Sequence, residues 1–441
     1  MSDISVNGTV AEKRKVILCA IYPQGGEDEA DISLGELEKL AETADCDCVG
    51  IVKQCKDKPD AATVLGSGKT AELSFLCKNT GAELVVFDCE LSPSQIKAIE
   101  DAMETEVNVI DRSMLILDIF ADHARTSEGR LQVELAQLRY TSPRLVGRGK
   151  ELSRQGGTSS SGSVGARGPG ETKLEIDRRR VKEKIAALEE ELRKVEQNRT
   201  TMRKQRDRSG MTKCGIVGYT NAGKSTLLNY LTGAGILAEN KLFATLDPTT
   251  RQFTTPSGTK LLLTDTVGFI RNLPHHLIKA FRSTLDEAVY SDILLIVIDS
   301  SDEEFISQTK VTTELLDELG CAGKPMIYVF NKCDACTDRD ALIHMKTLAA
   351  QSNTEVVFIS AKTGAGCDAL IEKIEEMANC GKHRISVMIP PEDGAVTGII
   401  YKDGEDVEMD YREDGIFCRL TADEKLYARL KKYIVEENGN E

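Results

Sequence analysis

An eight-residue glycine-rich segment constrains the fold of this chain more than any other feature. Gly218-Tyr-Thr-Asn-Ala-Gly-Lys-Ser225 matches the pattern G-x-x-x-x-G-K-[ST], follows the apolar run Cys214–Val217 and leads into the helix-like Thr226–Leu231. Glycines let the backbone bend until several N–H groups face one anion, and the helix N-terminus adds its dipole. We therefore predict a phosphate-binding loop formed by Gly218, Tyr219, Thr220, Asn221, Ala222, Gly223, Lys224, Ser225 and Thr226.

Two short motifs predict how a triphosphate and its metal ion are held. Lys224 is expected against the β- and γ-phosphates, and the hydroxyl of Ser225 is expected to ligate Mg²⁺. Forty residues after Ser225, Asp265-Thr-Val-Gly268 ends an apolar strand, so the Asp265 carboxylate can hold Mg²⁺ through a water molecule. The N–H of Gly268 can reach the γ-phosphate because glycine has no Cβ atom to intervene.

A third metal-facing residue is expected between these motifs. Thr245 lies 21 residues after Lys224, in Phe-Ala-Thr-Leu-Asp-Pro, and is the candidate switch threonine that closes on Mg²⁺ and the γ-phosphate. The neighbouring Thr249 and Thr250 remain alternatives for this role. The predicted catalytic residues are Lys224, Thr245 and Gly268, and the predicted Mg²⁺ ligands are Ser225, Thr245 and Asp265.

Two later segments predict which purine is bound. Asp334 of Asn331-Lys-Cys-Asp334 can accept hydrogen bonds from N1–H and the 2-amino group of guanine, whereas adenine offers neither donor and would leave the carboxylate unpaired. Asn331 should tie this loop to the phosphate loop, and the Lys332 stem should lie over the base. We therefore predict GTP rather than ATP, with base contacts from Asn331, Lys332, Asp334, Ser360, Ala361 and Lys362, the N–H of Ala361 reaching guanine O6.

Two other motifs resemble known sites only in part. Gly66-Ser-Gly-Lys-Thr70 looks like half a phosphate loop, but Thr63 stands where the first glycine is required. We predict a loop or a helix start there, with a second, ATP-hydrolysing site as the alternative. Cys333 and Cys336 form C-x-x-C without a second pair nearby, so their place in the base-binding loop explains them better than zinc does.

Alternating apolar and helix-like segments predict an α/β fold class. We expect a P-loop GTPase domain (211–380) preceded by a small parallel α/β domain (1–124) with a helical hairpin (125–210), and followed by a small α+β tail domain (381–441). The expected strands are Val16–Ile21, Val49–Val52, Leu84–Phe87 and Val107–Ile110 in the first domain, and Cys214–Val217, Lys260–Thr264, Ile293–Ile298, Met326–Phe330 and Glu355–Ile359 in the third.

The hairpin and the tail are predicted from spacing. One hairpin helix has Leu131, Leu135 and Leu138 on one face, and the other carries Val181, Ile185, Leu188, Leu192, Val195 and Met202. Between them, Gly156–Gly170 is dense in glycine and serine and is predicted as a loop. In the tail we expect strands at Ile385–Ile389, Ala395–Tyr401 and Ile416–Leu420, and a helix over Thr421–Tyr433.

Composition argues against a disordered, a membrane-spanning or a secreted protein. With 41% hydrophobic and 29% charged residues the chain has the composition of a globular protein. No run of 18 apolar residues predicts a membrane span, and the polar Met1–Val10 predicts no secretion signal. Thirteen cysteines, an odd number, fit reduced thiols in a cytoplasmic protein.

Charge is distributed unevenly along the chain. The net charge is −15, yet Arg125–Lys213 carries 22 basic and 12 acidic side chains. A basic segment inside an acidic protein predicts a nucleic-acid contact. A solvated helix of mixed charge is the alternative.

These motifs together resemble the HflX family of ribosome-associated GTPases, of the translation-factor-related class. Two longer stretches carry the resemblance, which covers nearly the whole chain: Gly165-Ala-Arg-Gly-Pro-Gly-Glu-Thr-Lys-Leu-Glu-Ile-Asp-Arg-Arg179, and Asp265-Thr-Val-Gly-Phe-Ile-Arg-Asn-Leu-Pro274 continuing into Ala280–Leu285. The resemblance implies GTP and GDP as ligands and binding to the large ribosomal subunit, with the hairpin near ribosomal RNA. It also implies splitting or rescue of stalled ribosomes under stress. The basic stretch then places RNA contacts at Arg167, Arg178, Arg179 and Arg180.

The resemblance also bears on catalysis. Phe269 stands where many related GTPases carry the glutamine that orients the attacking water, so slow basal hydrolysis is expected. Asn221 matches the asparagine that helps ligate K⁺ in K⁺-activated relatives, which implies a K⁺ site there. The ribosome is expected, together with K⁺, to raise the rate of GTP hydrolysis above its slow basal value. An RNA- or ribosome-binding scaffold that nucleotide only stabilises is the alternative function.

Overall fold

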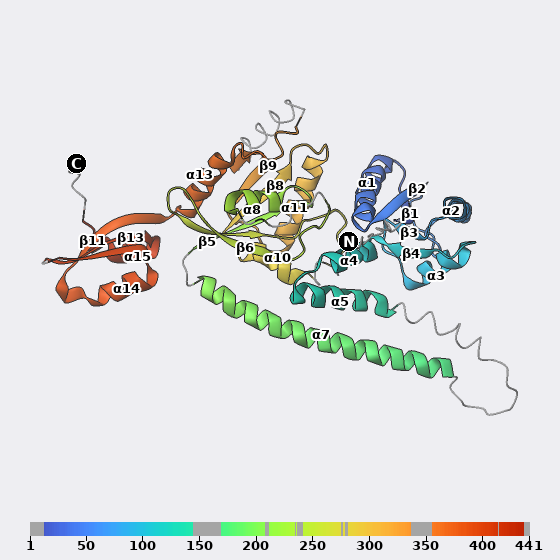
Figure 1. Ribbon diagram of the computed structural model, residues 1–441, viewed down its shortest axis with the longest axis horizontal. Helices are drawn as coiled ribbons and strands as arrows, with labels where there is room; N and C mark the ends of the chain where they lie inside the picture. Colours follow the sequence, from blue (N-terminus) through green and yellow to red (C-terminus); the bar gives the residue numbers. More distant parts are fainter. Residues whose placement is uncertain are drawn as a thin grey trace, which may run out of the picture.

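The computed structural model describes residues 13–143, 169–207, 211–233, 235, 241–274, 277, 281–336, 355–412 and 414–435. Three sheets follow one another along the chain, with four, six and three strands (Figure 1). The α/β fold class expected from the sequence is confirmed. No helix in these ranges combines the length and the apolar character that crossing a membrane requires.

The N-terminal domain is a parallel sheet in the strand order β2-β1-β3-β4. Its strands form because short, continuous apolar runs are buried on both faces, as in Val16–Ala20 of β1, where every residue is buried. Each of the four predicted strands overlaps an observed one. The elements are β1 (Arg14–Tyr22), α1 (Glu27–Thr43), β2 (Cys46–Cys55), α2 (Ser67–Thr80), β3 (Leu84–Phe87), α3 (Pro93–Ala102), β4 (Asn108–Asp111) and α4 (Arg112–His123).

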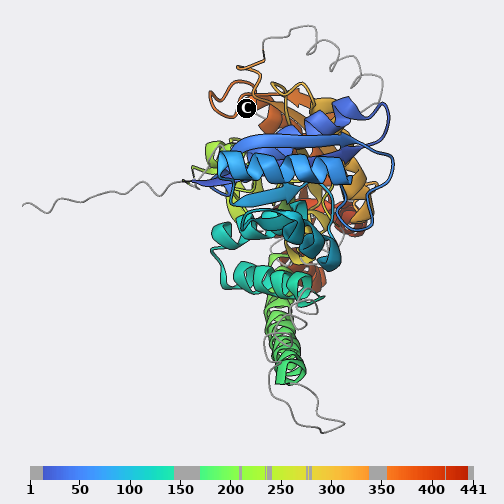
Figure 2. The ribbon, with the colours of Figure 1, turned by 90° about the vertical axis from the view of Figure 1, so that its right-hand side faces the viewer.

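A helical hairpin follows, formed by α5 (Ser127–Thr141) and the 39-residue α7 (Pro169–Asp207). The two helices run in opposite directions along one side of the molecule, and α7 extends well beyond α5 (Figure 1). The view of Figure 2 shows that they cross at an angle. Leu135 and Leu188 are buried between them, whereas the predicted face residues Leu131 and Leu138 are only half-buried. The buried face of α5 instead includes Val133 and Ala136, because α5 packs against α4 as well as α7.

The loop predicted between the hairpin helices lies mostly outside the described residues, and so does Arg167. Its last two residues are part of α7, which begins at Pro169. Proline is favoured in the first turn of a helix, where its missing N–H needs no partner.

The third domain has a six-stranded sheet in the order β10-β9-β8-β5-β7-β6, parallel except for β6. The edge strand β6 was not predicted, because its polar sequence TTRQFT lacks the apolar run that marks a buried strand. The elements are β5 (Thr212–Gly218), α8 (Lys224–Thr232), β6 (Thr249–Thr254), β7 (Lys260–Asp265), α10 (Arg282–Val289), β8 (Ile293–Asp299), α11 (Phe305–Glu318), β9 (Met326–Asn331), β10 (Glu355–Phe358) and α13 (Cys367–Ala378).

The tail has an antiparallel sheet in the order β11-β13-β12 covered by short helices. The prediction of a strand over Ala395–Tyr401 was wrong, because this segment is helical. Its β-branched residues favour strands, but the helix buries Ile400 against the sheet, and packing overrides that local preference. The elements are β11 (Lys382–Ile389), η2 (Pro391–Asp393), α14 (Ala395–Asp403), β12 (Glu405–Arg412), β13 (Gly415–Asp423), α15 (Glu424–Leu430) and η3 (Lys431–Tyr433).

The predicted helix over Thr421–Tyr433 therefore begins too early, since its first three residues belong to β13. The α-helix α15 covers only Glu424–Leu430 and is followed by the 3₁₀ turn η3. The strand that pairs with β13 in place of the wrongly predicted one is β12.

The N-terminal and third domains share one continuous apolar core. The ring of Phe120 in α4 lies edge-on to Phe243 at 4.7 Å and to Phe281 at 4.5 Å, both from the third domain. Aromatic contacts of this kind stabilise an interface beyond the area they bury. The two domains are therefore packed as one body, and the N-terminal domain lies against the segment that contains Thr245.

Candidate functional site

The phosphate loop connects β5 to α8, as the strand-loop-helix prediction requires. Gly218 and Gly223 have φ angles of 147° and 96°, in the region that favours glycine. A Cβ atom at Gly223 would lie 2.2 Å from Nδ2 of Asn331, so only glycine fits this close approach to the base-binding segment. The loop therefore has its N–H groups beside the N-terminus of α8, where an anion is favoured.

Lys224 is the buried cation of this loop. Its Nζ donates hydrogen bonds to the carbonyls of Gly218 at 3.1 Å and Tyr219 at 2.7 Å. Burial lowers the pKa of Lys224 to about 8, the charge of Asp265 opposes this shift, and that of Lys332 adds to it. The ammonium group is held inside the loop, where it would face an incoming phosphate.

Three side-chain oxygens meet beside Lys224. The hydroxyl of Ser225 lies 2.8 Å from that of Thr245 and donates to Oδ2 of Asp265 at 2.6 Å. Burial raises the pKa of Asp265. Among the described residues, its Oδ1 is one of few buried side-chain nitrogen or oxygen atoms without a hydrogen-bond partner. Hard oxygen donors with an unsatisfied carboxylate oxygen fit Mg²⁺. The alternative threonines, Thr249 and Thr250, lie instead in β6.

The segment after β7 is pressed against the phosphate loop. A Cβ atom at Gly268 would lie 2.6 Å from Cα of Thr220 and 3.0 Å from Nζ of Lys224, so this position requires glycine. Phe269 donates its N–H to the Gly218 carbonyl at 3.1 Å and accepts from the Thr220 N–H at 2.8 Å. Its ring is 1% exposed and lies in the core, so it contributes no polar group at the loop.

Asn331 joins the base-binding segments to the phosphate loop. It is buried, its Nδ2 donates to the Ala222 carbonyl at 2.8 Å, and its Oδ1 accepts from the Ala361 N–H at 2.9 Å. The neighbouring Lys332 pairs with Asp299 at 2.6 Å. Asp334 is exposed, and its hydrogen bond with Ser360 lowers its pKa, so the carboxylate stays ionised as an acceptor.

Several residues at this site were not found from the sequence. The pocket beside the phosphate loop is also lined by Lys241, Phe243, Ala244 and Thr266. The Tyr219 hydroxyl binds Glu36 of α1 and accepts from the Arg271 N–H at 2.8 Å. Glu36 and Tyr219 are 183 positions apart, and no sequence pattern predicts a contact over such a distance. The pairing of Asp299 with Lys332 likewise leaves no pattern in the local sequence.

The remaining predicted residues lie elsewhere. Arg178, Arg179 and Arg180 are exposed on α7. At the incomplete loop Gly66–Thr70, Gly66 is the residue before α2, Thr70 donates to its carbonyl at 3.1 Å, and Lys69 pairs with Glu72 at 2.7 Å. This segment is therefore a helix start.

Comparison with known proteins gives three matching family profiles. They are described as GTP-binding GTPase N-terminal (residues 31–121), GTP-binding GTPase Middle Region (123–206) and 50S ribosome-binding GTPase (213–332). The chain is 48% identical to the GTPase HflX of Lacrimispora saccharolytica over 95% of this chain and 96% of that protein. It is 38% identical to the GTPase HflX of Escherichia coli over 88% of each.

Among solved structures, a GTP-binding protein from Sulfolobus solfataricus in complex with GDP shares 27% identity. The match covers 83% of this chain and 99% of that chain, with a TM-score of 0.42. The fold, the phosphate loop and the profile matches together define a P-loop GTPase that hydrolyses GTP. The chain belongs to the HflX family, whose members match almost its whole length.

The bridge made by Asn331 gives a first prediction. Asn331→Ala leaves the Ala222 carbonyl and the Ala361 N–H without their buried partner, which costs about 1–3 kcal/mol for each group. We expect GDP and GTP affinities to fall together by at least tenfold in isothermal titration. Asn379→Ala, at an exposed position, is the control, and an unchanged affinity in Asn331→Ala would show that the bridge does not organise the site.

Proposed function

We propose that this GTPase is a cytoplasmic switch that binds the large ribosomal subunit and dissociates or rescues stalled ribosomes under stress. The match of residues 213–332 to the 50S ribosome-binding GTPase profile supports the partner. The basic hairpin supports contact with ribosomal RNA. Dissociation and rescue are the activities that the family resemblance implies.

The observation that carries this proposal is that α7 joins the exposed arginines of the hairpin to the nucleotide domain. Near one end, Arg199 pairs with Glu128 of α5 at 2.9 Å and with Glu287 of α10 at 3.3 Å, so the helix is fixed to the nucleotide domain. Arg178 and Arg180 are exposed about 30 Å away along the same helix, at 1.5 Å per residue. A single helix therefore connects exposed arginines to the domain that hydrolyses GTP.

The same proposal assigns roles at the nucleotide. Ser225, Thr245 and Asp265 would hold Mg²⁺, which supplies positive charge to the β- and γ-phosphates when bound. Lys224 and the loop N–H groups would neutralise the phosphates, the Gly268 N–H would face the γ-phosphate, and Asp334 would select guanine. Asn221 lines the pocket and would help to hold K⁺ beside the phosphates.

Turnover tests the role of the ribosome and of K⁺. Because the Phe269 ring is buried, no polar side chain at that position orients the attacking water, and basal turnover should be slow. We expect large subunits to raise kcat at least tenfold, and K⁺ to raise it further relative to Na⁺. Asn221→Gly keeps the left-handed backbone (φ 61°) but removes the amide, so it should lose the K⁺ effect.

Two results would contradict this account separately. If large subunits leave kcat unchanged, the ribosome is not the activator. If K⁺ and Na⁺ support the same rate, Asn221 holds no catalytic cation. Lys224→Ala should abolish ribosome-linked activity, whereas a nucleotide-stabilised scaffold would retain it.

The exposed arginines give a third prediction. Each phosphate contact adds about one unit to the slope of log affinity against log salt concentration. Arg178→Gln and Arg180→Gln combined should weaken binding to large subunits at 100 mM salt and lower that slope by one to two units. Lys310→Gln, an exposed cation on α11, is the matched control. A salt-independent association would contradict the role of these arginines.

A further inference from the structure

The segment that contains Thr245 is held by the N-terminal domain on one side and by the hairpin on the other. Before Thr245, the Leu242 N–H donates to Oγ1 of Thr43 at 3.3 Å, and the Phe243 ring packs on Phe120. After Thr245, Asp247 contacts the start of α5. Switch segments in GTPases are commonly ordered by the γ-phosphate and its metal ion. In this protein a second set of contacts, from another domain, fixes the same segment.

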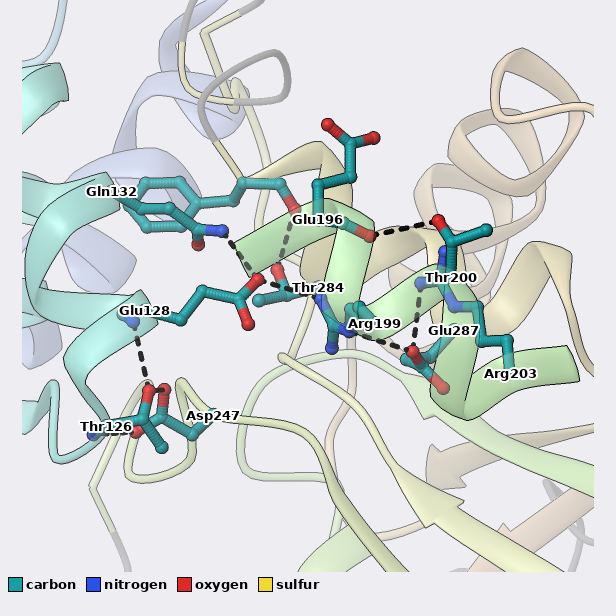
Figure 3. A network of polar contacts seen from close by, with 12 residues as sticks. Thr126, Glu128, Gln132, Glu196, Arg199, Thr200, Arg203, Asp247, Thr284 and Glu287 are labelled. Carbon is teal, nitrogen blue, oxygen red and sulfur yellow. Dashed lines mark hydrogen bonds and ion pairs between the residues drawn. The ribbon is translucent and has the colours of Figure 1, made fainter. Parts of the chain in front are cut away.

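Asp247 accepts three hydrogen bonds at the N-terminus of α5 (Figure 3). The donors are the N–H of Arg125 at 3.0 Å, the N–H of Thr126 at 2.9 Å, and the Thr126 hydroxyl. Thr126 in turn caps α5 by accepting the Gly129 N–H at 3.0 Å. A carboxylate is favoured at this end of a helix, so both charge and hydrogen bonding hold Asp247 there.

Asp247 is two residues from Thr245, so fixing Asp247 keeps the Cα atom of Thr245 within about 7 Å of the Cα atom of Asp247. Thr245 lies 2.8 Å from the Ser225 hydroxyl, at the cluster of oxygens that fits Mg²⁺. The helix that holds Asp247 also carries Glu128, the partner of Arg199 in α7 (Figure 3). The contact therefore lies between the metal-facing threonine and the helical hairpin.

We propose that Asp247 is a positioning residue for GTP binding and hydrolysis. Its carboxylate, bound to the start of α5, holds Thr245 at the metal-ligand position and links that position to the hairpin. This proposal rests on the proposed role of Thr245 toward Mg²⁺ and the γ-phosphate. It predicts that the Asp247 contact raises the affinity of the protein for GTP more than for GDP, because GDP lacks the phosphate that Thr245 would face.

Gly129 offers a way to disturb the contact without changing Asp247. A Cβ atom at Gly129 would lie 2.5 Å from Oδ1 of Asp247, closer than a Cβ atom approaches a non-bonded neighbour in folded proteins. The same Cβ atom would lie 3.2 Å from Oγ1 of Thr126, so the substitution strains the whole contact between Thr126 and Asp247, while alanine is a better helix former than glycine within α5. Gly398→Ala is the matched control, since a Cβ atom in that helix, α14, would meet nothing within 4 Å.

The experiment compares Asp247→Asn, Gly129→Ala and Gly398→Ala in the full chain. Titration calorimetry measures affinity for GDP and for the non-hydrolysable analogue GMPPNP with Mg²⁺, and steady-state kinetics gives kcat and KM. We expect the first two variants to bind GDP within twofold of the parent protein, but to lose at least fivefold in GMPPNP affinity and in kcat. The double variant Asp247→Asn/Gly129→Ala should lose no more than the larger single effect, because both changes break one contact.

Two outcomes overturn the proposal: equal loss of GDP and GMPPNP affinity, which marks a merely structural contact, or no loss of either. Thr245→Ala separates this failure from a failure of the proposed function. If Thr245→Ala leaves the ratio of GMPPNP to GDP affinity unchanged, the assigned role of Thr245 is wrong. If Thr245→Ala lowers the ratio and both Asp247→Asn and Gly129→Ala leave it unchanged, Asp247 is not the positioning residue.

Discussion

The packing of α4 against the nucleotide domain is the interaction on which the rest of the structure depends. Phe120 is buried between Phe243, beside the phosphate loop, and Phe281, before α10. Burial of large aromatic side chains makes this interface part of the protein core. Because α5 follows α4 closely in the chain, the same packing places the hairpin beside the nucleotide domain.

A buried polar network crosses the same interface. Arg112 at the start of α4 pairs with Glu36 and with Asp88, and Glu36 also binds the Tyr219 hydroxyl in the phosphate loop. Buried ion pairs add little net stability, because desolvation offsets their attraction, but removing one partner is costly. The network therefore joins the N-terminal domain to the phosphate loop, and loss of one partner would leave a buried charge unpaired at this interface.

Sequence patterns predicted the parts of the site whose signals are local. The phosphate loop, Asp265 and Asn331 each follow an apolar strand, and parallel strands bring such ends to one edge of a sheet, so motif order was enough. The contacts of Glu36 with Tyr219 and of Asp247 with α5 join segments more than 100 residues apart. They depend on how two domains pack, which no local pattern encodes.

The errors in the fold have related causes. The edge strand β6 has few apolar residues, so its sequence carries no signal of a buried strand. The helix α14 was predicted as a strand because its β-branched residues favour extended structure, while its packing on the tail sheet decides otherwise. Local preference is a reliable guide where a segment is buried on both faces, and a weaker one at sheet edges and covering helices.

Hydrogen exchange at the two residues that precede α5 tests the central claim, that the nucleotide site and the hairpin are coupled through the segment that contains Thr245 and Asp247. The N–H groups of Arg125 and Thr126 are bonded to Asp247, two residues from Thr245. If the account holds, these amides exchange more slowly in the presence of GMPPNP and Mg²⁺ than in the presence of GDP and Mg²⁺, while amides of α14 exchange equally in both. Equal exchange of the Arg125 and Thr126 amides in the two nucleotide states would contradict it.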